Sequence, residues 1–411
     1  MRRLVILASV LLATVAWADS GVDGFLAYLE RELAQDPSAA EAVVRALENA
    51  PTVATADRER LLDGLAGVLS THGQSALVPR LRALPLAGVS TLGAEPLAFP
   101  GDHGNHPHSF LEWWYFSGNL ESGGRRFGFE LSFFKTAVAV HYVHAAVTDV
   151  ARGAHPWQRR WVRPRDASFG EGRLAVAMAG CTAREDAGGR IALEFDTGGD
   201  HPVRARLSMK PERAPMIVNG DGVIDMPEGS TSRYYSVTRL TTSGTLEFPG
   251  RELVNVNGRS WFDHQWGNFV VFFRPWDWFS LQMDDGSDYN LFHFRPALGF
   301  NGRTCVNVLR PDGKLEVSRD LGIERRAWWT SPASGGHFVT RWSLTSPSAG
   351  ESFDVSTPVP DQEMPRTGGI DIPPAYWEGA IDVVRTRTGA GGITRGVGYC
   401  EHMPYRAERS R

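Results

Sequence analysis

The chain has 411 residues, of which 42% are hydrophobic and 22% are charged, and its 44 glycines and 25 prolines are too few for a disordered or collagen-like sequence. This length allows two or three globular domains of ordinary size. The net charge of −4 and the absence of a long basic run argue against a protein that binds nucleic acid by neutralising phosphates.

The first 20 residues follow the order of a secretory signal peptide. Arg2 and Arg3 precede an apolar run from Leu4 to Ala13, and Ala16-Trp-Ala18 matches an A-x-A cleavage site. The run is too short to span a bilayer, and no other stretch of 18 apolar residues occurs. We therefore predict a signal peptide over residues 1–18, cleavage after Ala18, and a secreted or periplasmic protein that does not span a membrane.

Residues 19–95 are expected to form a helical segment and a linker. Apolar residues recur at helical spacing between Gly24 and Leu69, which predicts two or three short helices. Four prolines between residues 79 and 100 then predict a linker or extended strap without a helix or a strand ladder. Because His72 is the only candidate side chain in this segment, we expect it to be dispensable for any chemistry.

Beyond residue 100, short aromatic and β-branched runs alternate with Gly, Asp and Asn, which predicts antiparallel β-structure. The runs cover residues 127–134, 233–240, 270–273 and 289–294. The segments Glu121-Ser-Gly-Gly124 and Asp284-Asp-Gly-Ser287 are placed for hairpin turns. No long helical pattern interrupts the runs, so a parallel βαβ architecture is not expected.

A weak internal repeat divides this β-rich region. Trp113-Trp-Tyr-Phe-Ser117 and Trp276-Asp-Trp-Phe-Ser280 agree at three of five positions. Two related β-domains explain the agreement. The predicted fold is therefore mainly β, with antiparallel barrel or sandwich domains over residues 96–268 and 269–411.

The 13 tryptophans and 21 phenylalanines are many for this length. Adjacent residues of a strand face opposite sides, so one member of each adjacent Trp pair can line an interior while its neighbour packs outside. The aromatic residues form either a large core or an apolar cavity for a bulky hydrophobic ligand, and the pattern leaves both open. The candidate ligand-binding residues are Trp113, Trp114, Tyr235, Trp266, Trp276 and Trp278.

The densest polar group is Asp263-His264 within Trp261-Phe-Asp-His-Gln-Trp-Gly267. Flanking indoles would exclude water and favour a neutral carboxyl, so Asp263 is a candidate proton donor and His264 would orient it. The alternative is a buried aspartate that caps a turn. Glu112, next to the first Trp pair, is the candidate for activating a water molecule.

Three histidines and Glu112 between residues 103 and 112 have the ligand types of a Zn²⁺ or Fe²⁺ site. The spacing is not H-E-x-x-H, and Pro107 would break a helix that aligned the side chains. We therefore expect a solvated loop, no metal and no other cofactor.

Other familiar site patterns do not occur in the sequence. The sequence contains no G-x-S-x-G, no P-loop motif and no G-x-G-x-x-G. These absences argue against a serine hydrolase of the usual kind, an NTPase and a dinucleotide-dependent enzyme. Cys181, Cys305 and Cys400 allow at most one disulfide.

The motifs together resemble the lipocalin-like family that includes AttH-type secreted proteins and the carotenoid 1,2-hydratases. The matching segments are Glu112-Trp-Trp-Tyr-Phe116, Arg126-Phe-Gly-Phe-Glu-Leu-Ser-Phe-Phe134, Ser232-Arg-Tyr-Tyr-Ser-Val-Thr-Arg-Leu240, Trp261–Gly267, Trp276–Ser280 and Gly398-Tyr-Cys-Glu401. The resemblance implies two lipocalin-like domains with an apolar binding region. For the hydratase members it also implies cofactor-free addition of water to a C=C bond. Gln265 departs from the glutamate usual in the family.

Two functions remain open from the sequence. One is a hydratase-like enzyme acting on a lipophilic, isoprenoid-like substrate, and the other is a non-catalytic periplasmic carrier of a hydrophobic ligand. A transporter partner cannot be identified from the sequence. The site is expected within the first domain, near its boundary with the second domain. Residues 269–411 are expected to act mainly as a wall of the site and as structural support.

Overall fold

A computed structural model describes residues 58–83, 95–107, 109, 111–136, 141–225, 231–267, 275–296, 302–365, 375–388 and 392–405, with isolated residues between 26 and 44. The predicted signal peptide and the strand expected at residues 270–273 lie outside these ranges.

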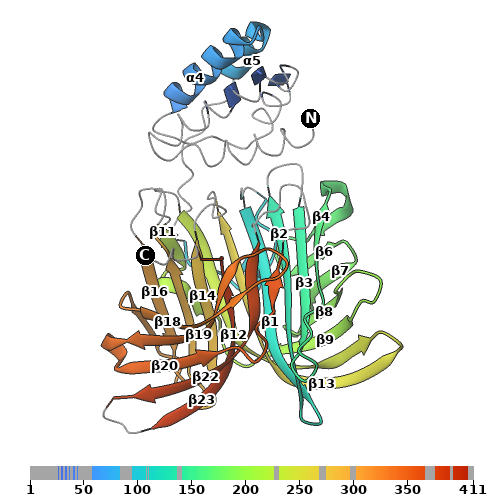
Figure 1. Cartoon of the computed structure of the whole chain (residues 1–411), viewed down its shortest axis with the longest axis vertical. Helices are drawn as coiled ribbons and strands as arrows, with labels where there is room; N and C mark the ends of the chain where they lie inside the picture. The colour runs from blue at the N-terminus through green and yellow to red at the C-terminus, as the bar shows by residue number, and fades with distance from the viewer. Residues whose placement is uncertain are drawn as a thin grey trace.

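The N-terminal segment contains α4 (Arg58–Thr71), the 3₁₀ turn η1 (Ser75–Leu77) and α5 (Val78–Arg82), which lie together beyond the ends of the strands (Figure 1). Its apolar side chains, including Leu65 and Leu81, form a small core of their own. The sequence predicts no helix after residue 79, and this is wrong for the first residues of that stretch, because α5 continues to Arg82. Pro79 stands in the first turn of α5, where a backbone N–H has no helical partner to lose. None of the described helices is both long and apolar enough to cross a membrane.

The first sheet runs from β1 to β13 and is antiparallel throughout its described pairs. Its strands are β1 (Leu111–Ser122), β2 (Arg125–Thr136), β3 (His141–Asp149), β4 (Trp157–Val162), β5 (Ala167–Phe169), β6 (Ala175–Met178), β7 (Cys181–Glu185), β8 (Ile191–Asp196), β9 (Arg204–Pro211), β10 (Met216–Ile217), β11 (Val223–Asp225), β12 (Thr231–Phe248) and β13 (Glu252–Gly267). The order is β4-β3-β2-β1-β13-β12-β9-β8-β7-β6-β5, with β10 and β11 on β12.

The second sheet is also antiparallel throughout its described pairs. Its strands are β14 (Trp276–Met283), β15 (Asp288–Phe294), β16 (Arg303–Leu309), β17 (Leu315–Ser318), β18 (Gly322–Thr330), β19 (His337–Ser346), β20 (Glu351–Ser356), β21 (Glu363–Met364), β22 (Tyr376–Arg387) and β23 (Ile393–His402). The order is β17-β16-β15-β14-β23-β22-β20-β19-β18, with β21 on β22. The mainly β, antiparallel fold class predicted from the sequence is confirmed, including hairpin turns after Ser122 and Met283.

The two repeated aromatic segments occupy equivalent places. β1 pairs with both β2 and β13, and β14 pairs with both β15 and β23, so the first strand of each sheet also meets its last. Each curled sheet encloses an apolar core: Phe116 and Phe129 lie in the first, Trp342 and Phe353 in the second. Cys181, Cys305 and Cys400 are buried and free.

The two sheets lie side by side and are joined by buried hydrogen bonds (Figure 1). The Gln282 Nε2 atom donates to the carbonyl oxygens of Thr238 at 2.7 Å and Ser260 at 2.9 Å. Thr148 donates from Oγ1 to Gln362 Oε1 at 2.7 Å. Removing either sheet would leave these buried groups without partners, so the sheets stabilise each other.

Candidate functional site

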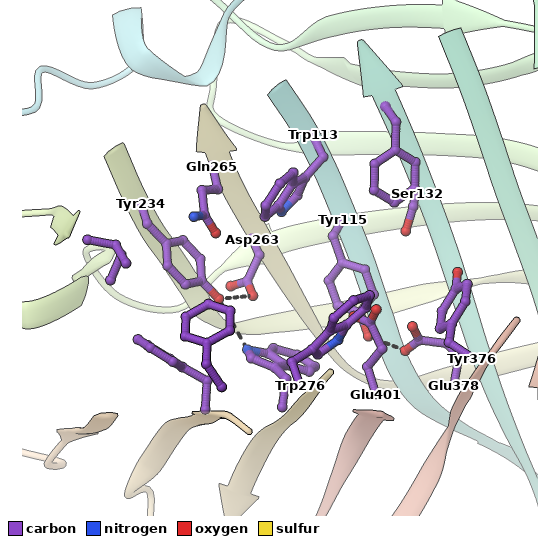
Figure 2. Close-up of a pocket in the computed structure, with 15 residues that line it drawn as sticks. Trp113, Tyr115, Ser132, Tyr234, Asp263, Gln265, Trp276, Tyr376, Glu378 and Glu401 are labelled. Carbon is purple, nitrogen blue, oxygen red and sulfur yellow. Dashed lines mark hydrogen bonds between the residues drawn. The ribbon is translucent and has the colours of Figure 1, made fainter. Parts of the chain in front are cut away.

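A pocket opens between the two sheets (Figure 2). The space between its walls, with the solvent at its mouth included, is about 880 Å³. The lining residues are Trp113, Tyr115, Ser132, Phe134, Ile224, Tyr234, Asp263, Gln265, Trp276, Trp278, Phe292, Phe294, Tyr376, Glu378 and Glu401. Most of this lining is aromatic, so a hydrophobic ligand would be buried against π-faces.

Strand register brings these residues together from distant parts of the sequence. In the first sheet, Asp263 of β13 stands directly opposite Tyr115 of β1, which in turn stands opposite Ser132 of β2. In the second sheet, Glu401 of β23 stands between Trp278 of β14 and Glu378 of β22. Since side chains alternate along a strand, each such row faces one side, and these rows face each other across the pocket.

Asp263 accepts hydrogen bonds on both carboxyl oxygens from neutral donors. The Tyr234 hydroxyl donates to Oδ2 at 2.5 Å, and the Trp261 indole Nε1 donates to Oδ1 at 2.6 Å. Asn290 and Trp278 donate in turn to the Tyr234 oxygen, at 2.8 and 3.2 Å. Burial raises the pKa of Asp263 to about 7, although its hydrogen bonds act in the opposite direction.

Glu378 and Glu401 form a pair of carboxyl groups on the other side of the pocket (Figure 2). Tyr115 donates to Glu378 Oε1 at 2.7 Å. Burial, followed by the charge of Glu401, raises the pKa of Glu378 well above its usual range. Burial and the nearby Glu130 raise that of Glu401 to about 8. Two facing carboxyls in an apolar site cannot both ionise at low cost, so this pair retains a proton near neutral pH.

Among the described residues that line the pocket, none is lysine, arginine or histidine. The carboxyl groups are therefore contacted by neutral donors and aromatic rings rather than by cations. A retained proton on one wall and a carboxyl acceptor on the other, with indoles between, is an arrangement suited to acid–base chemistry on an apolar molecule.

Four of the residues predicted from the sequence do lie in this pocket: Asp263, Trp113, Trp276 and Trp278. The other five, Glu112, Trp114, Tyr235, His264 and Trp266, do not. They occupy the opposite face of β1, β12 and β13, because each is an immediate strand neighbour of a lining residue. Of the three residues expected to act together, the structure brings Glu112 and His264 into contact, at 3.0 Å between Oε1 and Nε2, and places Asp263 apart from them in the pocket.

On that opposite face Glu112 is the centre of a separate polar cluster. Its Oε2 accepts from Lys135 Nζ at 2.5 Å, and its Oε1 lies 2.8 Å from His106 Nδ1 and 3.0 Å from His264 Nε2. Burial alone would raise the pKa of Glu112, but the two histidine contacts and the Lys135 charge outweigh it and hold the pKa at about 2. The loop expected to be solvated is so only in part: Gly101 and Pro107 are exposed, whereas His103 is buried with Tyr235.

Sequence reasoning missed Tyr234, Tyr115, Tyr376, Glu378 and Glu401 as site residues. Glu378 and Glu401 stand in apolar strand runs of the second sheet, and an acidic residue at an interior strand position is a usable signal. Because these residues line the pocket, the second sheet contributes carboxyl groups to it. The expectation that residues 269–411 act mainly as a wall is corrected.

Known proteins resemble the chain over the two sheets. The AttH-like family matches residues 91–405. The AttH candidate NE1406 from Nitrosomonas europaea is 24% identical, with a TM-score of 0.68 over 78% of this chain and 100% of that one. Kievitone hydratase from Nectria haematococca is 15% identical, with a TM-score of 0.61 over 76% of this chain and 94% of that one. No protein with a curated function matches the sequence.

Proposed function

Because the chain belongs to the AttH-like family, we propose that it is a hydratase-like enzyme that adds water to a C=C bond of a lipophilic, isoprenoid-like substrate held between the two sheets. One observation carries this proposal: three carboxyl groups, those of Asp263, Glu378 and Glu401, converge on an aromatic pocket whose described lining contains no cationic side chain.

The Glu378–Glu401 pair is the proposed proton donor. A carboxyl that keeps its proton near neutral pH can protonate one alkene carbon, which leaves a carbocation on the other and a negative charge on the pair. The π-faces of Trp276, Trp278 and Trp113 would stabilise the cation in a site from which water is largely excluded. Positioned acid catalysis is worth roughly 10²–10⁴-fold, and the aromatic environment would supply the rest.

Asp263 is the proposed acceptor. Both of its oxygens already accept hydrogen bonds, from Tyr234 and Trp261, which holds the carboxyl as an acceptor rather than as the donor expected from the sequence. A water molecule attacks the cation, its oxygen forms the new C–O bond, and its second proton passes to Asp263. Transfer of that proton back to the Glu378–Glu401 pair through solvent restores the enzyme, so the net reaction is alkene plus water to alcohol.

Turnover in labelled water tests the proposal. The full-length protein is incubated with acyclic terpenoid alkenes in H₂¹⁸O, and the alcohol product is examined for ¹⁸O. We expect one ¹⁸O per product, with the rate reduced in Glu401→Gln and Asp263→Asn. Glu363→Gln is the matched control, because Glu363 is a buried carboxyl outside the pocket, bonded by Ser331.

The carrier function is the alternative to catalysis. In that case no ¹⁸O would enter any product in the labelled-water assay. A second measurement, native mass spectrometry of the freshly purified protein, would find a stoichiometric, unchanged lipid. The fold shared with kievitone hydratase supports the enzyme, since that protein's name specifies addition of water.

Export is the remaining part of the proposal. The sequence features of residues 1–18 support a signal peptide. Intact-mass measurement of the protein recovered from periplasm or medium should give a chain that begins at Asp19, and an intact Met1 would contradict this.

A further inference from the structure

The cluster around Glu112 lies on the sheet face opposite the pocket and takes no part in the proposed reaction. It brings together three potential metal ligands: His106, Glu112 and His264, whose nitrogen and oxygen ligand atoms all lie within 4.8 Å of one another. His106 belongs to the loop after the 3₁₀ turn η2 (Gly101–His103), Glu112 to β1 and His264 to β13. From these three segments we propose a binding site for one divalent transition-metal ion of the Zn²⁺ class.

The inner distances fit a single ion. Two ligands bound to one Zn²⁺ at its usual bond lengths lie about 3.3 Å apart in tetrahedral geometry. Glu112 Oε1 is 2.8 Å from His106 Nδ1 and 3.0 Å from His264 Nε2. A small outward movement of the three atoms would therefore place an ion between them, with a fourth position left for water or another ligand.

The outer nitrogen of each histidine already has the partner that a metal ligand requires. His106 Nε2 lies 3.2 Å from Asp102 Oδ1, and His264 Nδ1 donates to the backbone carbonyl of Asp102 at 2.8 Å. One residue of η2 thus orients both imidazoles through its carboxylate and its carbonyl. Metal-bound histidines almost always donate their other N–H to a carboxylate or carbonyl in this way.

Among the residues that the structure describes, Lys135 is the lysine or arginine that contacts Glu112 and could oppose this site. Its ammonium contacts Glu112 Oε2, Asn105 Oδ1 and the carbonyl of His106, and it is not bonded to the Oε1 atom that faces the histidines. Glu112 can therefore bind the ion through Oε1 and keep Lys135 on Oε2. The His106 side chain is 23% exposed, so one of the three ligand residues reaches the surface of the described structure.

Cobalt binding by the full-length protein tests the site. The protein is freed of metal with a chelator and titrated with Co²⁺, whose visible d–d bands report coordination, and Zn²⁺ is then added as a competitor. We expect one equivalent of Co²⁺, displaced by one equivalent of Zn²⁺, and a melting temperature that rises with either ion.

Two histidine variants separate the site from surface binding. His106→Gln should weaken Co²⁺ binding by more than about 100-fold, because loss of even an outer partner of a metal ligand weakens binding by 10- to 100-fold. His293→Gln is the matched control: His293 is also half-buried beside a carboxylate, Asp277, at 3.3 Å. It should bind Co²⁺ as the unmodified protein does.

Two results would overturn the proposal. One is a folded, unmodified protein, shown by its near-UV circular dichroism, that gives no stoichiometric d–d bands. The other is His106→Gln binding Co²⁺ as tightly as the unmodified protein. Because activity is not measured, neither result depends on the hydratase proposal.

Discussion

Carboxyl groups on the two sides of the first sheet lie in opposite electrostatic settings. Glu112 of β1 is fully buried with a lysine and two histidines around it, and its pKa lies at about 2. Glu401 of β23 is half-buried in the pocket wall, its neighbours among the described residues are neutral or acidic, and its pKa lies at about 8. Burial acts in the same direction on both, so the sign of the neighbouring charge decides which carboxyl is held ionised and which keeps a proton.

The largest expected difference between the faces is in stability. Glu112→Gln leaves Lys135 and two histidines without their buried carboxylate, so the free energy of unfolding should fall by about 3–5 kcal/mol. Glu401→Gln removes no ion pair and should change the free energy of unfolding by about 1 kcal/mol or less at pH 6. Urea denaturation of both variants measures this. Equal losses would show that the faces do not differ as described.

A loss of stability as the pH rises is expected from the carboxyl groups of the pocket face. The folded-state pKa of Glu401, about 8, is above the unfolded value of 4.5, so the folded protein binds the extra proton and stability falls as pH rises between these values. The neighbours that share this effect are Glu130, Glu378 and Asp263. Glu401→Gln should reduce the slope by about 1.4 kcal/mol per pH unit.

Urea titrations at several pH values between 5 and 9 check this slope. Glu363→Gln serves again as the control for a buried carboxyl outside the pocket. An unchanged slope in Glu401→Gln would mean that the pKa of Glu401 is nearly the same in the folded and the unfolded protein.

Adjacent tyrosines of β12 offer a matched pair. The Tyr234 hydroxyl bonds Asp263 in the pocket, whereas the Tyr235 hydroxyl lies 2.6 Å from His103 Nδ1 on the other face. Each Tyr→Phe change leaves buried polar partners unsatisfied and should reduce the free energy of unfolding by about 1–3 kcal/mol. Only Tyr234→Phe should also lower turnover, measured with the ¹⁸O assay. A similar loss of turnover in Tyr235→Phe would contradict the separation of the two faces.

The smallest effect on stability is expected at Trp113. Trp114 is fully buried and packs on His264, with ring centroids 4.9 Å apart, whereas Trp113 is only half-buried in the pocket wall. Trp113→Phe should therefore change the free energy of unfolding by less than about 1 kcal/mol, against about 1–3 kcal/mol for Trp114→Phe. Ligand affinity, followed by tryptophan fluorescence, should weaken in Trp113→Phe and hold in Trp114→Phe.

The fold was largely predictable because its signals are local. The turns after Ser122 and Met283 and the aromatic runs between them need only a few neighbouring residues to be recognised. The start of α5 does not follow from a rule that excludes proline from every helical position, because the first turn of a helix accepts proline.

The site was only partly predictable because it depends on pairing between distant strands. Alternation predicted that Trp113 and Trp114 face opposite sides, and the structure confirms this. The same rule, applied to the adjacent residues Asp263 and His264, predicts that their side chains face opposite sides of β13. No local sequence signal shows that Glu378 pairs with Glu401, because packing fixes the register of strands whose residues lie 23 positions apart. Nor does a local signal show that these two residues lie opposite the first sheet.

The alternation along β13 also limits how the protein can change during evolution. A one-residue insertion or deletion between Trp261 and Trp266 would exchange the residues that face the pocket with those that face the Glu112 cluster, so both regions would be lost in one event. Substitutions alter one face at a time. We therefore expect natural length variation to fall in the outer turn between Phe248 and Glu252, where strand β12 ends and β13 begins, rather than in the segment that carries both faces.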